Sequence, residues 1–202
     1  MKHLFPLAPI LLCLAACQSN PTPPAATSAT PPIPAAPPKE QPATPEHIEA
    51  SMLTITGLPD GEVTTQQLLR QLGRPDSIAK GAVECGSRLD VPMNSPNGDF
   101  WYYGKTMYEV NGPQAIWCSF DVTSGKFQGK LGTLVLNQNT TLEDVRRFFP
   151  IAAREADKPS TSQPGEEEMS LPFYDKDMPM DDSLTLLFKH GRLQAVEYFT
   201  PC

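Results

Sequence analysis

Residues 107–117, which read MYEVNGPQAIW, decide the fold of this chain of 202 residues. Two short runs rich in β-branched, aromatic and other apolar side chains flank Asn111-Gly112. An Asn-Gly pair between such runs is the strongest short-range signal for a β-hairpin, because both residues tolerate the backbone angles of a tight turn. The stretch therefore predicts antiparallel strands over 107–110 and 114–117, with a turn at Asn111-Gly112.

A second hairpin is predicted near the end of the chain. Residues 184–188 and 193–199 are strand-like runs on either side of His190-Gly191. The triplet Gln114-Ala115-Ile116 in the first hairpin resembles Gln194-Ala195-Val196 in the second. The two hairpins are therefore interpreted as copies of one unit.

Two capped helices repeat in the same way. Thr64 with Gln67 forms a capping-box pattern before an apolar helix face, and Gly73 ends that helix. Residues 140–150 predict a second helix, in which Thr141 corresponds to Thr64 at nearly the same separation as the two hairpin triplets. A strand-like run, 132–137, precedes this second helix.

These patterns predict an α+β domain over residues 46–202. It would consist of two tandem copies, about 50–127 and 128–202, each with a helix and an antiparallel β-meander. The helices are expected to pack on one face of the sheet, which is the usual way for an amphipathic helix to bury its apolar side.

The first helix carries a family resemblance. Its pattern Thr64-x-x-Gln67-Leu68-x-x-x-Leu72-Gly73-x-Pro75 resembles the helix motif of the BamE (SmpA/OmlA) lipoproteins and of the β-lactamase inhibitory proteins. The resemblance is confined to this helix and the turn that ends it. It implies a domain that works through protein contacts, in outer-membrane β-barrel assembly in one family and in enzyme inhibition in the other.

The chain begins with an apolar leader. Residues 4–14 are almost wholly apolar and are too short for a membrane-spanning helix, which needs roughly 20 residues. The leader ends in Leu14-Ala15-Ala16-Cys17, which resembles the lipobox of bacterial lipoproteins. That resemblance implies removal of residues 1–16 and lipid on Cys17. Gln18 after the anchor implies an outer-membrane protein that faces the periplasm, with exposure at the cell surface left open.

A proline-rich segment separates the lipid anchor from the domain. Proline is the most frequent residue in 18–45, and few of the others are large and apolar. Residues 17–45 are therefore predicted to be an extended tether, reaching on the order of 85 Å at ~3.1 Å per residue. Loss of Lys2 with the leader changes the formal charge from −7 to −8, which argues against nucleic-acid binding.

The sequence contains no local motif for catalysis, a metal ion or a cofactor. Its three histidines stand apart from other ligand-type residues, so we expect a protein that is not an enzyme and has no cofactor. A polar pocket lined by Asp99, Glu109 or Asp121 would argue for an envelope hydrolase instead. The aspartates of residues 175–182 are interpreted as a solvated loop, with a basic partner or weakly bound calcium as alternatives.

Two side-chain sets are candidate sites. In a strand over 100–103, Trp101 and Tyr103 share one face, which is predicted to be an interaction surface. Cys85 and Cys118 are the preferred disulfide pair because both lie in the first copy, with pairings to Cys202 left open.

Taken together, these features predict a lipid-anchored envelope protein that binds another protein. The alternative is an inhibitor or immunity protein against a toxin or a lysozyme-like enzyme, since an acidic domain attracts basic enzymes.

Overall fold

The computed structural model describes residues 46–58, 61–84, 86–92, 94–158 and 165–202. The predicted leader, the lipid anchor Cys17 and the tether 17–45 lie outside these residues. All the described residues belong to one unit of the chain, 40–202.

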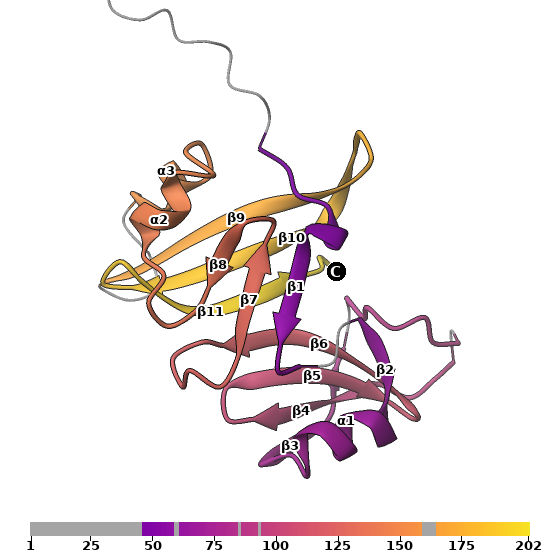
Figure 1. Ribbon diagram of the computed structural model, residues 1–202. Helices are drawn as coiled ribbons and strands as arrows, with labels where there is room; N and C mark the ends of the chain where they lie inside the picture. The colour runs from indigo at the N-terminus through magenta and orange to yellow at the C-terminus, as the bar shows by residue number, and fades with distance from the viewer. Residues whose placement is uncertain (1–45, 59–60, 85, 93, 159–164) are drawn as a thin grey trace, which may run out of the picture. The chain divides into compact units, whose positions relative to one another are not determined.

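Two antiparallel sheets account for most of the described residues (Figure 1). The smaller sheet has the strand order β1-β7-β8, and comprises β1 (Leu53–Thr56), β7 (Gln128–Leu131) and β8 (Leu134–Leu136). The larger sheet has the order β3-β4-β5-β6-β11-β10-β9, and β2 also pairs with β6. Its strands are β2 (Glu62–Thr64), β3 (Ser77–Val83), β4 (Gly98–Tyr103), β5 (Thr106–Asn111), β6 (Gln114–Asp121), β9 (Glu166–Asp175), β10 (Met178–Lys189) and β11 (Arg192–Phe199).

The larger sheet consists of two meanders that meet at β6 and β11. Strands β4, β5 and β6 follow one another in the first meander, and β9, β10 and β11 do so in the second. Pairing of Phe120 with Val196 lies at the centre of the β6–β11 contact. The same edge of β6 is shared, because β2 pairs with its first part, 114–116, and β11 with 119–121.

Both predicted hairpins are confirmed, and the first turn is displaced by one position. Asn111 pairs with Gln114, so the two-residue loop is Gly112-Pro113 rather than Asn111-Gly112. Gly112 has a φ of 55°, which suits the first position of a type II′ turn. In the second hairpin, Lys189 pairs with Arg192 around His190-Gly191, where both φ values are positive.

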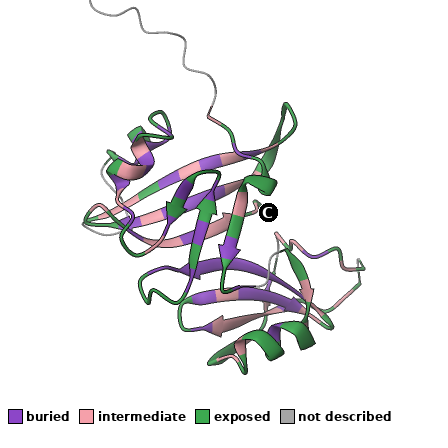
Figure 2. Ribbon diagram, in the orientation of Figure 1, coloured by how far each residue is buried: buried purple, intermediate pink, exposed green. Residues whose placement is uncertain are grey.

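The hydrophobic core lies where the smaller sheet meets the larger one. Phe120 is fully buried in β6, and a Cβ atom built on Gly129 of β7 would lie only 2.9 Å from its ring. Glycine at this position therefore lets the two sheets approach closely. Leu131 and Leu136 from the smaller sheet, and Leu186 from β10, belong to the same core, whose purple segments run through both sheets in Figure 2.

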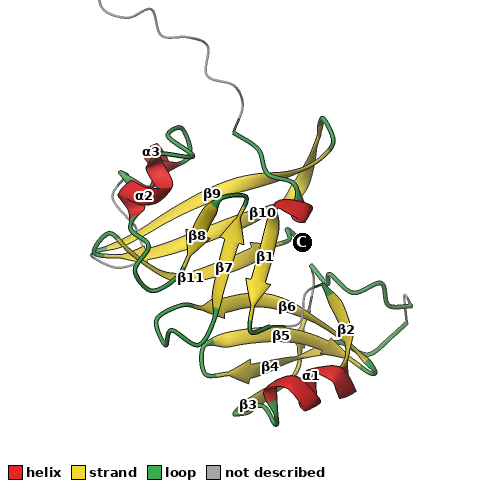
Figure 3. Cartoon of the chain, viewed as in Figure 1, coloured by secondary structure: helices red, strands yellow, loops and turns green. Residues whose placement is uncertain are grey.

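The fold is mostly β, and the predicted α+β class with helices packed on the sheet is wrong. The α-helices among the described residues are α1 (Thr65–Leu72), α2 (Leu142–Arg146) and α3 (Ala153–Ala156), whereas strands dominate the cartoon in Figure 3. Helices of eight, five and four residues are too short to cover a sheet of eight strands. Strands β1, β7 and β8 supply the second layer instead. None of the described helices has the length and apolar character needed to cross a membrane.

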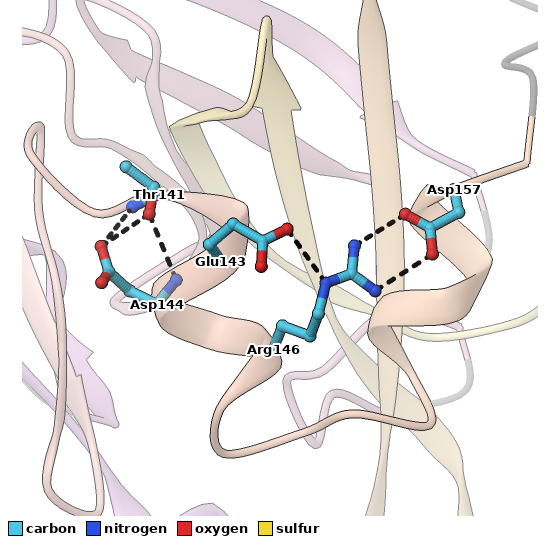
Figure 4. A network of polar contacts seen from close by, with 5 residues as sticks. All are labelled: Thr141, Glu143, Asp144, Arg146 and Asp157. Carbon is cyan, nitrogen blue, oxygen red and sulfur yellow. Dashed lines mark hydrogen bonds and ion pairs between the residues drawn. The ribbon is translucent and has the colours of Figure 1, made fainter. Parts of the chain in front are cut away.

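The predicted helix over 140–150 is divided in two. α2 ends at Arg146, and α3 begins at Ala153 after a turn. The Arg146 guanidinium donates to both carboxylate oxygens of Asp157, at 3.0 and 2.7 Å, and to Glu143 at 3.1 Å (Figure 4). This bidentate contact holds the two short helices together.

The starts of α1 and α2 have matching environments. Thr64 and Thr141 each form a capping box with the residue three positions later. The next N–H group donates to a hairpin turn in both cases, from Thr65 to the Pro113 carbonyl and from Leu142 to the Gly191 carbonyl.

The triplet match between the hairpins does not align equivalent positions. Gln114 directly follows the loop 112–113, whereas Gln194 stands further from its own loop, 190–191. The helix starts and the hairpin loops support a common origin of the two halves better than the triplets do. A duplication of the two halves stays a prediction.

Candidate interaction surface

Trp101 and Tyr103, the predicted interaction surface, belong to the core side of the sheet. Tyr103 is buried, and its hydroxyl donates to the Gly73 carbonyl at 3.2 Å. Trp101 is half-buried and packs against the hydrophobic core. Trp101 and Tyr103 lie on the same face of the strand, as predicted. That face packs on the core, so it is not the interaction surface that the sequence predicted.

The cysteines also differ from the preferred pairing. Cys118 is a free, buried thiol, and Cys202 takes part in a disulfide. Burial raises the pKa of the Cys118 thiol to about 11, so it stays protonated near neutral pH. The predicted Cys85–Cys118 disulfide is therefore wrong, because Cys118 is not bonded to another cysteine. Cys85 lies outside the described residues.

The three carboxylates considered for hydrolysis lie in different environments. Asp99 forms an ion pair with Lys80 at 2.6 Å, which holds the pKa of Asp99 below its usual range. Glu109 is buried and accepts hydrogen bonds from the Ser87 hydroxyl and the Arg88 N–H group. Asp121 accepts from Thr123 and lines a pocket that neither of the other two reaches. Of the pockets that the described residues form, none of those with a defined lining contains two of these carboxylates.

A better candidate surface is the tip of the β9–β10 hairpin, residues 175–181, called here the hairpin tip. Asp175 pairs with Met178 across a two-residue loop, and all seven residues are exposed. Met178 and Met180 are 72% and 42% exposed, and three aspartates, Asp175, Asp177 and Asp181, lie among them. Methionine is flexible and polarisable, and it recurs on binding surfaces that adapt to a partner.

The loop of this hairpin has an uncommon backbone. Lys176 has a φ of 58°, a left-handed conformation that a lysine rarely adopts. Glycine would be the ordinary choice at the first position of such a turn.

The base of this hairpin is built around Tyr198 of β11. Its hydroxyl donates to Asp182 at 2.9 Å, and its ring stacks on Phe173 with 4.8 Å between centroids. The β9–β10 ladder is interrupted between Pro179 and Ser183, so Asp182 lies in a bulge. Burial, and then the bond to Asp182, raises the pKa of Tyr198 to about 12.

Arg88 completes the base from the connection between β3 and β4. Its Cζ atom lies 3.3 Å from the centre of the Tyr198 ring, and its guanidinium donates to the Trp117 carbonyl. Burial lowers the pKa of Arg88, and the interaction with Tyr198 works against that change. A guanidinium remains charged at any physiological pH, so this contact joins a cation to an aromatic face.

The residues before the first strand hold the outer edge of β9. The Ile48 N–H group donates to the Pro172 carbonyl at 3.2 Å, and the Ile48 carbonyl accepts from Tyr174 at 2.8 Å. Glu46 accepts from the N–H groups of Ile151 and Ala152, at 2.7 and 2.8 Å. Next to the hairpin tip, β9 is therefore held by β10 on one edge and by Ile48 on the other.

This arrangement suits recognition of a protein. Two exposed methionines give adaptable apolar contact, and the aspartates favour a basic partner. The aspartates were visible in the sequence, but Met178 and Met180 were not identified, because apolar residues beside a strand are usually buried. No set of three His, Cys, Asp or Glu side chains among the described residues is arranged to hold a metal ion.

Comparison with family models, curated proteins and solved structures finds no match to this chain.

Proposed function

We propose that the chain is a lipid-anchored envelope protein that binds a basic protein through the hairpin tip. The exposed pair Met178 and Met180, set among aspartates on a fixed base, is the observation that carries this proposal. The lipobox pattern and the proline-rich segment 17–45 support an anchored domain held at a distance from the membrane.

The contact is tested by site-specific photo-crosslinking in cells. A photoreactive amino acid at position 178 should give a crosslinked product of defined mass, and the same probe at Leu69, an exposed apolar residue on α1, should give none. Replacing both methionines with aspartate should abolish the product, because charge replaces the apolar contact. Leu69→Asp is the matched control and should leave the product intact. Equal crosslinking from both positions would contradict a specific contact at the hairpin tip.

The identity of the captured protein separates two roles. Recovery of barrel-assembly components would support an accessory of envelope assembly, which the resemblance of the Thr64–Pro75 motif implies. Recovery of a single basic secreted enzyme would support an inhibitor or immunity protein. The acidic hairpin tip favours the second role, and association should then slow as salt is added.

The anchor is tested separately. Cys17→Ser should abolish incorporation of labelled fatty acid and move the protein from the membrane to the soluble fraction. Retention of the variant in the membrane fraction would contradict the lipid anchor and leave the crosslinking result unaffected.

A further inference from the structure

A second feature lies at the end of the first meander, where three connections meet. They enclose a pocket of about 260 Å³ between α1 and β3, β4 and β5, and β6 and β7. Each connection contributes one basic side chain, Arg74, Lys105 or Lys126. Three cations around one pocket are unexpected in a chain whose formal charge is −7.

The two acidic residues of this pocket, Asp76 and Asp121, offset only part of its positive charge, and three cations against two carboxylates leave a formal excess of one positive charge. None of the three basic side chains forms an ion pair with a carboxylate of a described residue. Asp76 accepts a hydrogen bond from the Gly104 N–H group at 2.6 Å. Asp121 accepts from the Thr123 hydroxyl at 2.7 Å. Both carboxylates thus hold the connections in place through neutral donors, and neither forms an ion pair with a basic side chain of the pocket.

Apart from Ser124 and Gly104, the rest of the lining is aliphatic or aromatic. Phe127 is buried, and the Lys126 ammonium lies 5.0 Å from the centre of its ring. Tyr103 is anchored to the Gly73 carbonyl, and Leu72 lines the pocket beside it. A ligand would therefore meet three cationic side chains from three connections, two carboxylates that are held by other donors, and an apolar wall.

We propose that this pocket binds a phosphate ester, with the phosphate held by Arg74, Lys105 and Lys126. Arginine presents a planar fork of donors that matches a phosphate group, and lysine adds a mobile point charge. The apolar wall of Leu72 and Tyr103 suits the organic part of the ester. The pocket shares no residue with the hairpin tip, and it is basic where the tip is acidic. This site therefore does not depend on the proposed protein contact.

The site is tested by titrating the purified chain with inorganic phosphate at constant ionic strength. Saturable changes are expected in the amide resonances of Gly73, Gly104 and Gly125, which lie in the three connections. Arg74→Gln, Lys105→Gln and Lys126→Gln should each weaken binding by about tenfold, since each removes a charged donor.

Two other lysines provide the controls. Lys80 pairs with Asp99, and Lys130 lies on β7, so neither lines the pocket. Lys80→Gln and Lys130→Gln should leave phosphate affinity unchanged. Non-saturable changes, or equal weakening by the control variants, would overturn the proposal. Glycerol phosphate and vesicles with phosphatidic acid then distinguish a soluble ester from a lipid headgroup, because the source that competes with inorganic phosphate is the one that the pocket accepts.

Discussion

The β5–β6 and β9–β10 hairpins are built alike and lie in opposite environments. Each has a two-residue loop between long antiparallel strands. The loop of the first is engaged by α1, because the Thr65 N–H group donates to the Pro113 carbonyl and the Thr65 hydroxyl to the Gly112 carbonyl. The loop of the second makes no such contact with a helix among the described residues, and its tip is exposed.

If the hairpin tip binds a partner as proposed, stability and recognition are carried by separate hairpins. β6 is buried along nearly its whole length and pairs with β2, β5 and β11. The hairpin tip of β9–β10 adds little to the core and carries adaptable side chains. Substitutions in the two hairpins should therefore have opposite consequences for unfolding and for partner binding.

The largest effect is expected in the buried hairpin. Phe120→Ala should lower the free energy of unfolding by about 3–5 kcal/mol, because it leaves a cavity between the two sheets. Met178→Ala should change it by no more than about 0.5 kcal/mol, as expected for an exposed side chain. Urea unfolding followed by circular dichroism measures both. Equal losses would show that the two hairpins contribute alike to stability, which would contradict this division.

The disulfide of Cys202 should matter next, since it fixes the chain just after β11, which supports the base of the exposed hairpin. Cys202→Ser should cost about 2–4 kcal/mol and make unfolding insensitive to a reducing agent. Cys118→Ala should keep that sensitivity, because Cys118 is a free thiol. If Cys118→Ala abolished it, the assignment of the two cysteines would be wrong.

The base of the exposed hairpin should show an intermediate effect. Arg88→Ala should cost about 1–2 kcal/mol, because the Trp117 carbonyl loses its charged donor. Tyr198→Phe should cost about 1 kcal/mol through the lost bond to Asp182. Hydrogen exchange should show faster opening of residues 173–182 in both variants and unchanged protection in β5. Faster exchange in β5 would contradict a role confined to the base.

The smallest effect is expected at Glu197 of β11, which pairs with Thr185 of β10. Burial and the charge of Glu168 raise the pKa of Glu197. A raised pKa stabilises the fold only at acidic pH, and this contribution disappears as pH rises through the folded-state pKa. Glu197→Gln should therefore raise the free energy of unfolding at pH 7 by about 0.5 kcal/mol and have no effect near pH 4. Thermal unfolding across this range, with exposed Glu84→Gln as control, would detect the difference; a gain that persists at pH 4 would refute it.

Local features of the fold could be predicted because neighbouring residues determine them. The capping boxes at Thr64 and Thr141 and the turn at His190-Gly191 depend on residues within a few positions of one another. The smaller sheet depends on contacts between distant segments, such as β1 with β7. No local pattern indicates that Gly129 will lie against Phe120, so helices were expected where a second sheet lies.

The candidate site was predictable only in part. Alternation along β4 correctly separated Trp101 and Tyr103 from Phe100 and Tyr102, but which face is covered depends on strands elsewhere in the chain. The aspartates of the hairpin tip were evident, whereas the exposure of Met178 depends on how far β9 and β10 extend beyond their neighbours.

The attachment of Ile48 to β9 has a mechanical consequence. A pull on the N-terminal side of the domain would first load the two bonds between Glu46 and the turn at 151–152, and then the two hydrogen bonds between Ile48 and β9. The hairpin tip begins at Asp175, directly after Tyr174, whose N–H group donates to Ile48. Tension between a membrane anchor and a partner held at the hairpin tip would thus pass through the contact of Ile48 with the end of β9 and load its two hydrogen bonds in shear, rather than the core around Phe120.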